Sequence, residues 1–192
     1  MGSRESEYTL KRWKAHSGSW WHRKHGYQGS LGNFGRVEVE TPVRIRGNRY
    51  VTEIRGKSVP FVAFCGWQYG GKPSLVFGEL TVAGEIVPVQ RDRWALSRQG
   101  RALRFEVDGR AYRYYAPSRR HRHRALAREG VGVEIVTRRP RRGEGKSATV
   151  SVRGPADAMD VALAVLLCGV NTRNLTPGGA VRTFLYRVFP FL

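Results

Sequence analysis

One segment near the carboxyl end limits the possible folds of this chain more than any other. Residues 161–168 read VALAVLLC and contain no polar side chain. The flanking residues are typical start and stop signals for a helix: Pro155, Asp157, Asp160 and Gly169. The pattern predicts a helix over residues 155–168, and a helix that is apolar on all sides must be buried on all sides.

Before this helix the hydrophobic pattern has a period of two, which is typical of β-strands with one buried and one exposed face. The segments RVEVE (36–40), VRIRG (43–47) and RYVTEI (49–54) show it clearly. Asp108-Gly109 separates two further alternating segments, and this pair predicts a type I′ hairpin. We expect about ten short strands.

Hiding the whole circumference of the helix requires a sheet that wraps around it. The predicted fold is therefore mainly β: an antiparallel β-barrel or closed sheet of about ten strands around a buried hydrophobic C-terminal helix. We expect residues 36–192 to form this single domain. Residues 1–35 show neither period and mix tryptophans with basic residues, so we expect an irregular basic and aromatic N-terminal arm.

Two segments, FEVDGRAY (105–112) and DAMDVALAVLLC (157–168), together resemble the tubby C-terminal-like superfamily, which includes LURP-one-related and scramblase-like proteins. The similarity extends over about residues 74–170. It implies many antiparallel strands followed by a hydrophobic helix that fills the barrel. It also implies binding to phosphoinositides or other membrane lipids, without assigning that role to particular residues here.

The charge of the chain is strongly unbalanced. Its 34 Lys and Arg residues exceed its 15 Asp and Glu residues, which gives a formal net charge of +19. Such a surplus destabilises a compact chain unless a partner neutralises it. Nucleic acid, an anionic membrane surface or an acidic protein partner would each do so.

The most basic part of the sequence lies between residues 117 and 146, and nine arginines in it are the candidate polyanion-binding residues. They are Arg119, Arg120, Arg122, Arg124, Arg128, Arg138, Arg139, Arg141 and Arg142. Two neighbouring strands would unite them into one guanidinium surface for phosphate groups. The alternative is a solvated charged loop.

Aromatic residues alternate with basic residues near the amino end. The candidates for stacking on bases, or for contact with a membrane interface, are Trp13, Trp20, Trp21 and Tyr27. The alternative is that these side chains simply pack against the barrel, because tryptophan is usually mostly buried.

The sequence favours a protein without an active site or a cofactor. The five histidines match no established zinc spacing, the carboxylates are scattered, and no phosphate-binding loop is complete. We therefore expect no metal site and no enzyme activity. Cys65 and Cys168 lie in apolar segments, which favours two buried thiols in the reducing cytoplasm, and no segment is long enough to be transmembrane.

These features together predict a cytoplasmic, non-enzymatic polyanion-binding module. Binding to the phosphate backbone of nucleic acid is the first hypothesis. Binding to anionic phospholipid at a membrane surface, and service as a small basic structural subunit of a larger assembly, are the alternatives.

Overall fold

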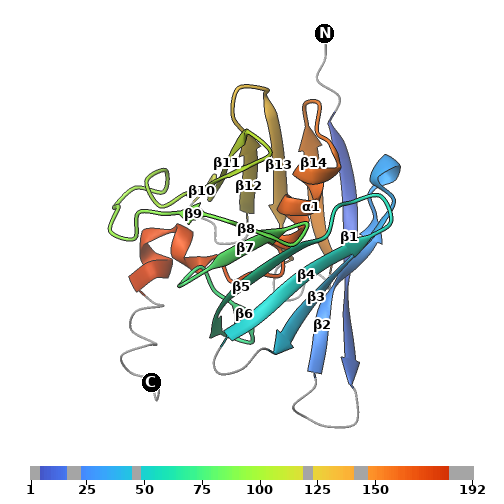
Figure 1. The fold of residues 1–192 in the computed structure, drawn as a ribbon, viewed down its shortest axis with the longest axis horizontal. Coiled ribbons are helices and arrows are strands. Elements are labelled where there is room, and N and C mark those ends of the chain that lie inside the picture. Colours follow the sequence, from blue (N-terminus) through green and yellow to red (C-terminus); the bar gives the residue numbers. More distant parts are fainter. Residues whose placement is uncertain (1–4, 17–22, 45–48, 119–122, 141–146, 182–192) are drawn as a thin grey trace.

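The computed structural model describes residues 5–16, 23–44, 49–118, 123–140 and 147–181, and confirms a mainly β fold (Figure 1). Fourteen strands, more than the ten expected, form an antiparallel sheet. They are β1 Ser6–His16, β2 Arg23–Ser30, β3 Arg36–Arg44, β4 Arg49–Gly56, β5 Val62–Tyr69, β6 Lys72–Pro73, β7 Glu79–Val82, β8 Glu85–Val87, β9 Val89–Gln90, β10 Leu103–Val107, β11 Arg110–Tyr115, β12 His123–Arg128, β13 Val133–Arg138 and β14 Ser147–Arg153. Short 3-10 turns cover Gly32–Phe34 and Arg173–Leu175.

The sheet curves into a nearly closed barrel because its two edge strands are consecutive in the chain. The strand order runs from β8 through β7, β5, β4, β3, β2, β1, β14, β13, β12, β11 and β10 to β9. β8 pairs with β7 and β9 pairs with β10, and Pro88 separates them. Proline has no N–H to donate to a ladder, so it suits the position at which the chain changes partner.

Helix α1 (Ala158–Leu166) occupies the interior of this barrel, as the apolar segment predicted. Residues 161–166 have no exposed surface, and the helix contacts β12 and β13 as well as β4 and β5. These two pairs of strands lie far apart in the strand order, so the helix packs against opposite walls. No helix in the described part of the chain is long and apolar enough to cross a membrane.

The helix begins three residues later than expected. Asp157 has extended backbone angles and caps the helix, accepting hydrogen bonds from the N–H groups of Met159 and Asp160. The side chain of Asp160 accepts from the N–H of Asp157 in return, which completes a capping box. An N-cap residue has non-helical backbone angles, so the helix begins after Asp157 and Pro155 lies outside it.

The expectation of an irregular arm over residues 1–35 is wrong. Strands β1 and β2 make up most of the described residues of this region, and both belong to the barrel sheet. Along β1 the buried face changes from Tyr8 and Leu10 to the exposed Arg12 and Lys14. Because charged residues continue the inward-facing column, the strand lacks the apolar alternation by which it would be recognised.

The Asp108-Gly109 turn between β10 and β11 is a predicted feature that the structure confirms. Both residues have positive φ angles, 51° at Asp108 and 71° at Gly109, as a type I′ turn requires. Tyr112 and Tyr114 on β11 face the interior and are almost completely buried. The turn thereby sets the register that directs both rings into the core.

Candidate anion-binding site

The two ends of the barrel differ in their ionic groups, and the arginines predicted to form one surface are divided between them. We call the upper end the one where β1, β11 and β13 begin, and the lower end the one where β1 and β13 end (Figure 1). β12 pairs with β13 in antiparallel register, with His123 opposite Arg138. The other five predicted arginines lie outside the described residues: Arg119, Arg120, Arg122, Arg141 and Arg142.

Arg124 is not part of an exposed surface, contrary to the prediction. It is 2% exposed and points inward from β12. Its Nε donates to Thr172 Oγ1 and its Nη2 to the Thr172 carbonyl oxygen, both at 2.9 Å. Burial, together with the smaller effect of the Arg139 charge, lowers the pKa of Arg124 to about 10. The guanidinium therefore holds the segment after α1 in place inside the lower end.

Arg128 points inward four residues further along β12, at the upper end. Its Nη1 lies 3.0 Å from Asp160 Oδ2 and 3.2 Å from Asp157 Oδ2, and its Nη2 donates to the Pro155 carbonyl. Only 10% of its side chain is exposed. The prediction that Arg128 belongs to a polyanion-binding surface is wrong, because two carboxylates at the start of α1 already compensate its charge.

Arg139 lies immediately after β13 and binds the other end of the helix. Its Nη2 donates to three carbonyl oxygens, those of Leu167 at 3.3 Å, Cys168 at 2.9 Å and Val170 at 2.7 Å. A cation is favourable there, because the last carbonyl groups of a helix carry partial negative charge. Arg138, its neighbour, is exposed on the other face of the strand.

Lys72 on β6 reaches the same helix end. Its Nζ donates to the Cys168 carbonyl at 3.2 Å and lies 5.6 Å from the ring centroid of Tyr27. Burial, then the charges of Arg139 and Arg12, lower the pKa of Lys72 to about 7. A lysine is therefore held close to other cations, without a carboxylate in an ion pair with it among the described residues.

Arg12 and Lys14 complete the cluster from β1. Both are exposed, and strand alternation places them on the inward face that Leu10 occupies higher up. They face His25 on β2, which pairs with Lys14. Burial, then the charges of Lys72, Arg12 and Lys14, lower the pKa of His25 to about 4, so this imidazole is neutral at physiological pH.

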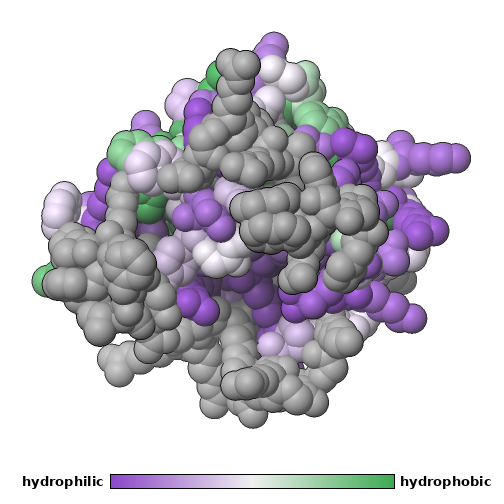
Figure 2. Space-filling model, turned by 90° about the horizontal axis from the view of Figure 1, so that it is seen from below, coloured by the Kyte–Doolittle hydropathy of each residue, from purple (hydrophilic) through white to green (hydrophobic). Residues whose placement is uncertain are grey.

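We call this cluster the basic mouth; its members are Arg12, Lys14, Lys72, Arg124 and Arg139. Figure 2 shows the molecule from this end, where the described residues visible in the centre are hydrophilic. The ion pairs formed between described residues involve other cations: Lys24, Arg49, Arg55, Arg110, Arg128 and Arg153. The basic mouth is thus a local excess of positive charge, partly offset by the carbonyl end of α1.

The aromatic residues proposed for stacking are in different environments. Tyr27 is 7% exposed and belongs to the core below Lys72, so it is not accessible to a base. Trp13 is half-buried and lies over Gly26 of β2, where a Cβ atom would be 3.0 Å from its indole nitrogen. Both therefore fit the packing interpretation. Trp20 and Trp21 lie outside the described residues.

Neither a metal-binding cluster nor an activated thiol is found in the described part of the chain. It contains no group of three or more His, Cys, Asp or Glu side chains placed to hold a metal ion. Burial raises the pKa of both free thiols, Cys65 and Cys168, which makes each a poorer nucleophile. The basic mouth is consequently the strongest candidate site.

Three of the five members of the basic mouth were not predicted: Arg12, Lys14 and Lys72. A usable signal existed for the first two, because they continue the parity of Tyr8 and Leu10 once β1 is known to be a strand. Lys72 follows Gly70-Gly71, both with positive φ angles, in a tight turn that returns the chain toward the interior. The Gly70-Gly71 pair is a hairpin signal that could have located the turn, but nothing in the local sequence indicates that Lys72 points to the interior.

Comparisons with known proteins identify no relative of this chain. No protein family, no curated protein and no solved structure matches the chain. The similarity to the tubby C-terminal-like superfamily therefore has only the two sequence segments behind it.

Proposed function

We propose that this protein is a non-enzymatic polyanion-binding module that binds the phosphate backbone of nucleic acid at the basic mouth. One observation carries the proposal: cations from β1, β6, β12 and the end of β13 converge at one end of the barrel. None of them forms an ion pair with a described carboxylate.

The members of the basic mouth have different roles in this proposal. Arg124 and Arg139 donate to backbone carbonyls, so they shape the site and maintain its positive potential. Arg12 and Lys14 are exposed, and we assign the phosphate contacts to them. Arginine suits this role because its planar group donates two parallel hydrogen bonds to a phosphate.

The decisive experiment measures binding to labelled single-stranded and duplex oligonucleotides, and to anionic vesicles, over a series of salt concentrations. Each phosphate contact steepens the dependence of log affinity on log salt by roughly 0.7 for single strands and 0.9 for duplex DNA. The double variant Arg12→Ala/Lys14→Ala should therefore bind more weakly and reduce the slope by about two contacts.

A matched control removes the same charge from elsewhere. Lys11 lies on the outer face of β1, next to Arg12, and Arg104 is exposed on β10. Lys11→Ala/Arg104→Ala should change the slope much less. Equal effects of the two double variants would show that net charge alone governs binding, and binding to vesicles but not to oligonucleotides would refute the nucleic-acid proposal.

A further inference from the structure

The loop between β9 and β10 exposes apolar side chains to an unusual degree. Residues 91–101 read RDRWALSRQGR, and Trp94 and Leu96 are each 88% exposed. Large aromatic residues are normally mostly buried, and their exposure on a surface commonly indicates contact with a partner. Trp94 makes no contribution to the core that would explain its presence.

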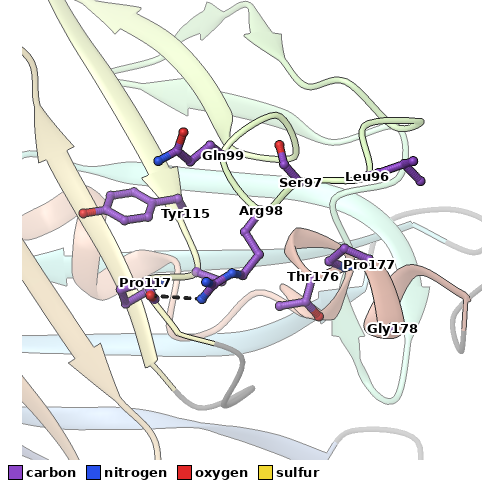
Figure 3. A pocket seen from close by; sticks show the side chains of 10 residues that line it. Leu96, Ser97, Arg98, Gln99, Tyr115, Pro117, Thr176, Pro177 and Gly178 are labelled. Carbon is purple, nitrogen blue, oxygen red and sulfur yellow. Dashed lines mark hydrogen bonds between the residues drawn. The ribbon is translucent and has the colours of Figure 1, made fainter.

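Hydrogen bonds hold this loop in a defined shape. Asp92 Oδ1 accepts from the N–H groups of Trp94 at 2.8 Å and Ala95 at 3.1 Å. Arg98 Nη1 donates to the Pro117 carbonyl at 3.0 Å, across a cavity of about 730 Å³ (Figure 3). Arg91 Nη1 donates to the Asn174 carbonyl at 3.3 Å. The turn that carries Trp94 is therefore anchored at both of its ends.

Arginines and aromatic rings alternate beside this loop. The guanidinium of Arg93 lies 5.3 Å from the ring centroid of Phe77, and the Phe77 ring lies 5.5 Å from that of Trp67. Phe77 is 52% exposed and Trp67 40% exposed. These two rings and Arg49 line a groove of about 470 Å³. Glu79 also lines it and forms a 3.7 Å ion pair with Arg49. Arg93, over the Phe77 ring, forms no ion pair with a carboxylate of the described residues.

This surface adjoins the lower end of the barrel. Trp67 lies near the end of β5, and the chain then passes through Tyr69 into Lys72 of the basic mouth. The guanidinium of Arg173 lies 6.0 Å from the ring centroid of Tyr69. Cations and aromatic rings therefore continue from the groove toward the basic mouth along one strand end.

We propose that this surface is a stacking platform for the unpaired bases of a single-stranded nucleic acid, with Trp94 as its most accessible ring. We call it the aromatic platform, and its members are Trp67, Phe77, Arg93 and Trp94. Proteins that bind single strands combine a cationic track for the backbone with aromatic rings on which bases stack. The inference depends on the proposed function and adds the class of nucleic acid, because the bases of a duplex are not free to stack on a protein ring.

The test compares two equally exposed residues of the same loop, one with a ring and one without. We expect Trp94→Ala to weaken binding to a single-stranded oligonucleotide roughly tenfold at fixed salt, since loss of one stacked base costs about that much affinity. Trp94→Phe should retain most of the affinity, and Leu96→Ala should leave it nearly unchanged. Duplex affinity and the salt slope should stay at wild-type values in all three variants.

Several results would overturn the inference and leave the proposed function intact. If Trp94→Ala binds single strands as well as the wild type, while Arg12→Ala/Lys14→Ala still binds weakly, the platform is refuted and the basic mouth is not. If Leu96→Ala and Trp94→Ala lose equal affinity, general apolar contact operates and stacking does not. Loss of vesicle binding or of self-association in both variants, with oligonucleotide binding unchanged, would assign the loop to lipid or to a second copy. Absence of oligonucleotide binding by the wild type would refute both proposals.

Discussion

Two arginines on the inner face of β12 show how differently the two ends of the barrel treat the same side chain. Arg128 at the upper end faces the carboxylates of Asp157 and Asp160, whereas Arg124 at the lower end faces the hydroxyl and carbonyl of Thr172. Only Leu126 separates them on that face. Asp157 and Asp160 belong to the start of helix α1, where carboxylates are favourable, whereas Thr172 belongs to the segment that follows the helix and offers Arg124 only neutral acceptors.

Among the described residues, the inward-facing cations of the two ends therefore differ in how their charge is compensated. Carboxylates compensate the inward cations of the upper end, so we assign that end to stability. Partial charges on carbonyl groups compensate the cations of the basic mouth incompletely, and the basic mouth retains a positive potential. Burial of charge with only neutral partners is costly, which is why such a cluster points to an anionic ligand.

The largest expected loss of stability comes from removing a carboxylate that compensates Arg128 at the upper end. Asp160→Asn removes the charge that lies 3.0 Å from Arg128 and weakens the hydrogen bond donated by the Tyr112 hydroxyl. Removing one partner of a buried ion pair typically costs about 3–5 kcal/mol. Because Asp157 remains as a second partner of Arg128, we expect a loss at the lower limit, about 3 kcal/mol in the free energy of unfolding. Urea denaturation measures this loss.

The control for that measurement is an acid on the outer wall. Glu106 is exposed on β10, and Glu106→Gln should change the free energy of unfolding by less than about 0.5 kcal/mol. A loss of similar size in both variants would contradict the compensated upper end.

A smaller effect is expected at the lower end. Arg139→Met removes the donor to three carbonyl oxygens but also removes a positive charge beside Lys72, so gain and loss partly cancel. We expect a loss of about 1–2 kcal/mol in urea denaturation. The pKa of Lys72 should rise at the same time, as a titration followed by NMR would show. A loss of stability as large as that of Asp160→Asn would contradict the proposed difference in charge compensation between Arg128 and the basic mouth.

A pH dependence, which is the smallest effect over any single pH unit, identifies the basic mouth most directly. Because the pKa of Lys72 is lowered to about 7 in the folded state and is 10.5 as the ordinary value, the unfolded chain binds more protons between these two pH values. The contribution of Lys72 to stability therefore rises with pH from about 7 to about 10, by at most about 1.4 kcal/mol per pH unit.

Lys72→Met isolates this contribution, because every other titrating group remains. The wild type minus variant difference in unfolding free energy should increase with pH over that interval. A difference that is flat or decreases with pH would show that the lysine is not held among cations.

Much of the fold follows from local patterns in the sequence. The apolar residues 161–168 predict a buried helix, and the alternation after residue 36 together with Asp108-Gly109 predicts antiparallel strands. β1 escaped prediction because its inward column turns from Leu10 to Arg12 and Lys14, so hydrophobicity no longer marks the inner face. Trp94 escaped for a related reason: the segment RWALS alternates like a strand, but forms an anchored turn.

The sequence alone determined that a basic chain with a net charge of +19 would wrap strands around one apolar helix. Hydrophobic periodicity and total charge can be read from the order and identity of the residues, and neither depends on which residues are in contact in the folded protein. Only the tertiary structure decided which cations are compensated. Arg128 and Arg124 have similar sequence contexts, but Arg128 meets the carboxylates at the start of α1 and Arg124 meets Thr172 in the segment after the helix. The closed barrel brings these partners together, because it places β12 beside a helix that begins some thirty residues later in the chain.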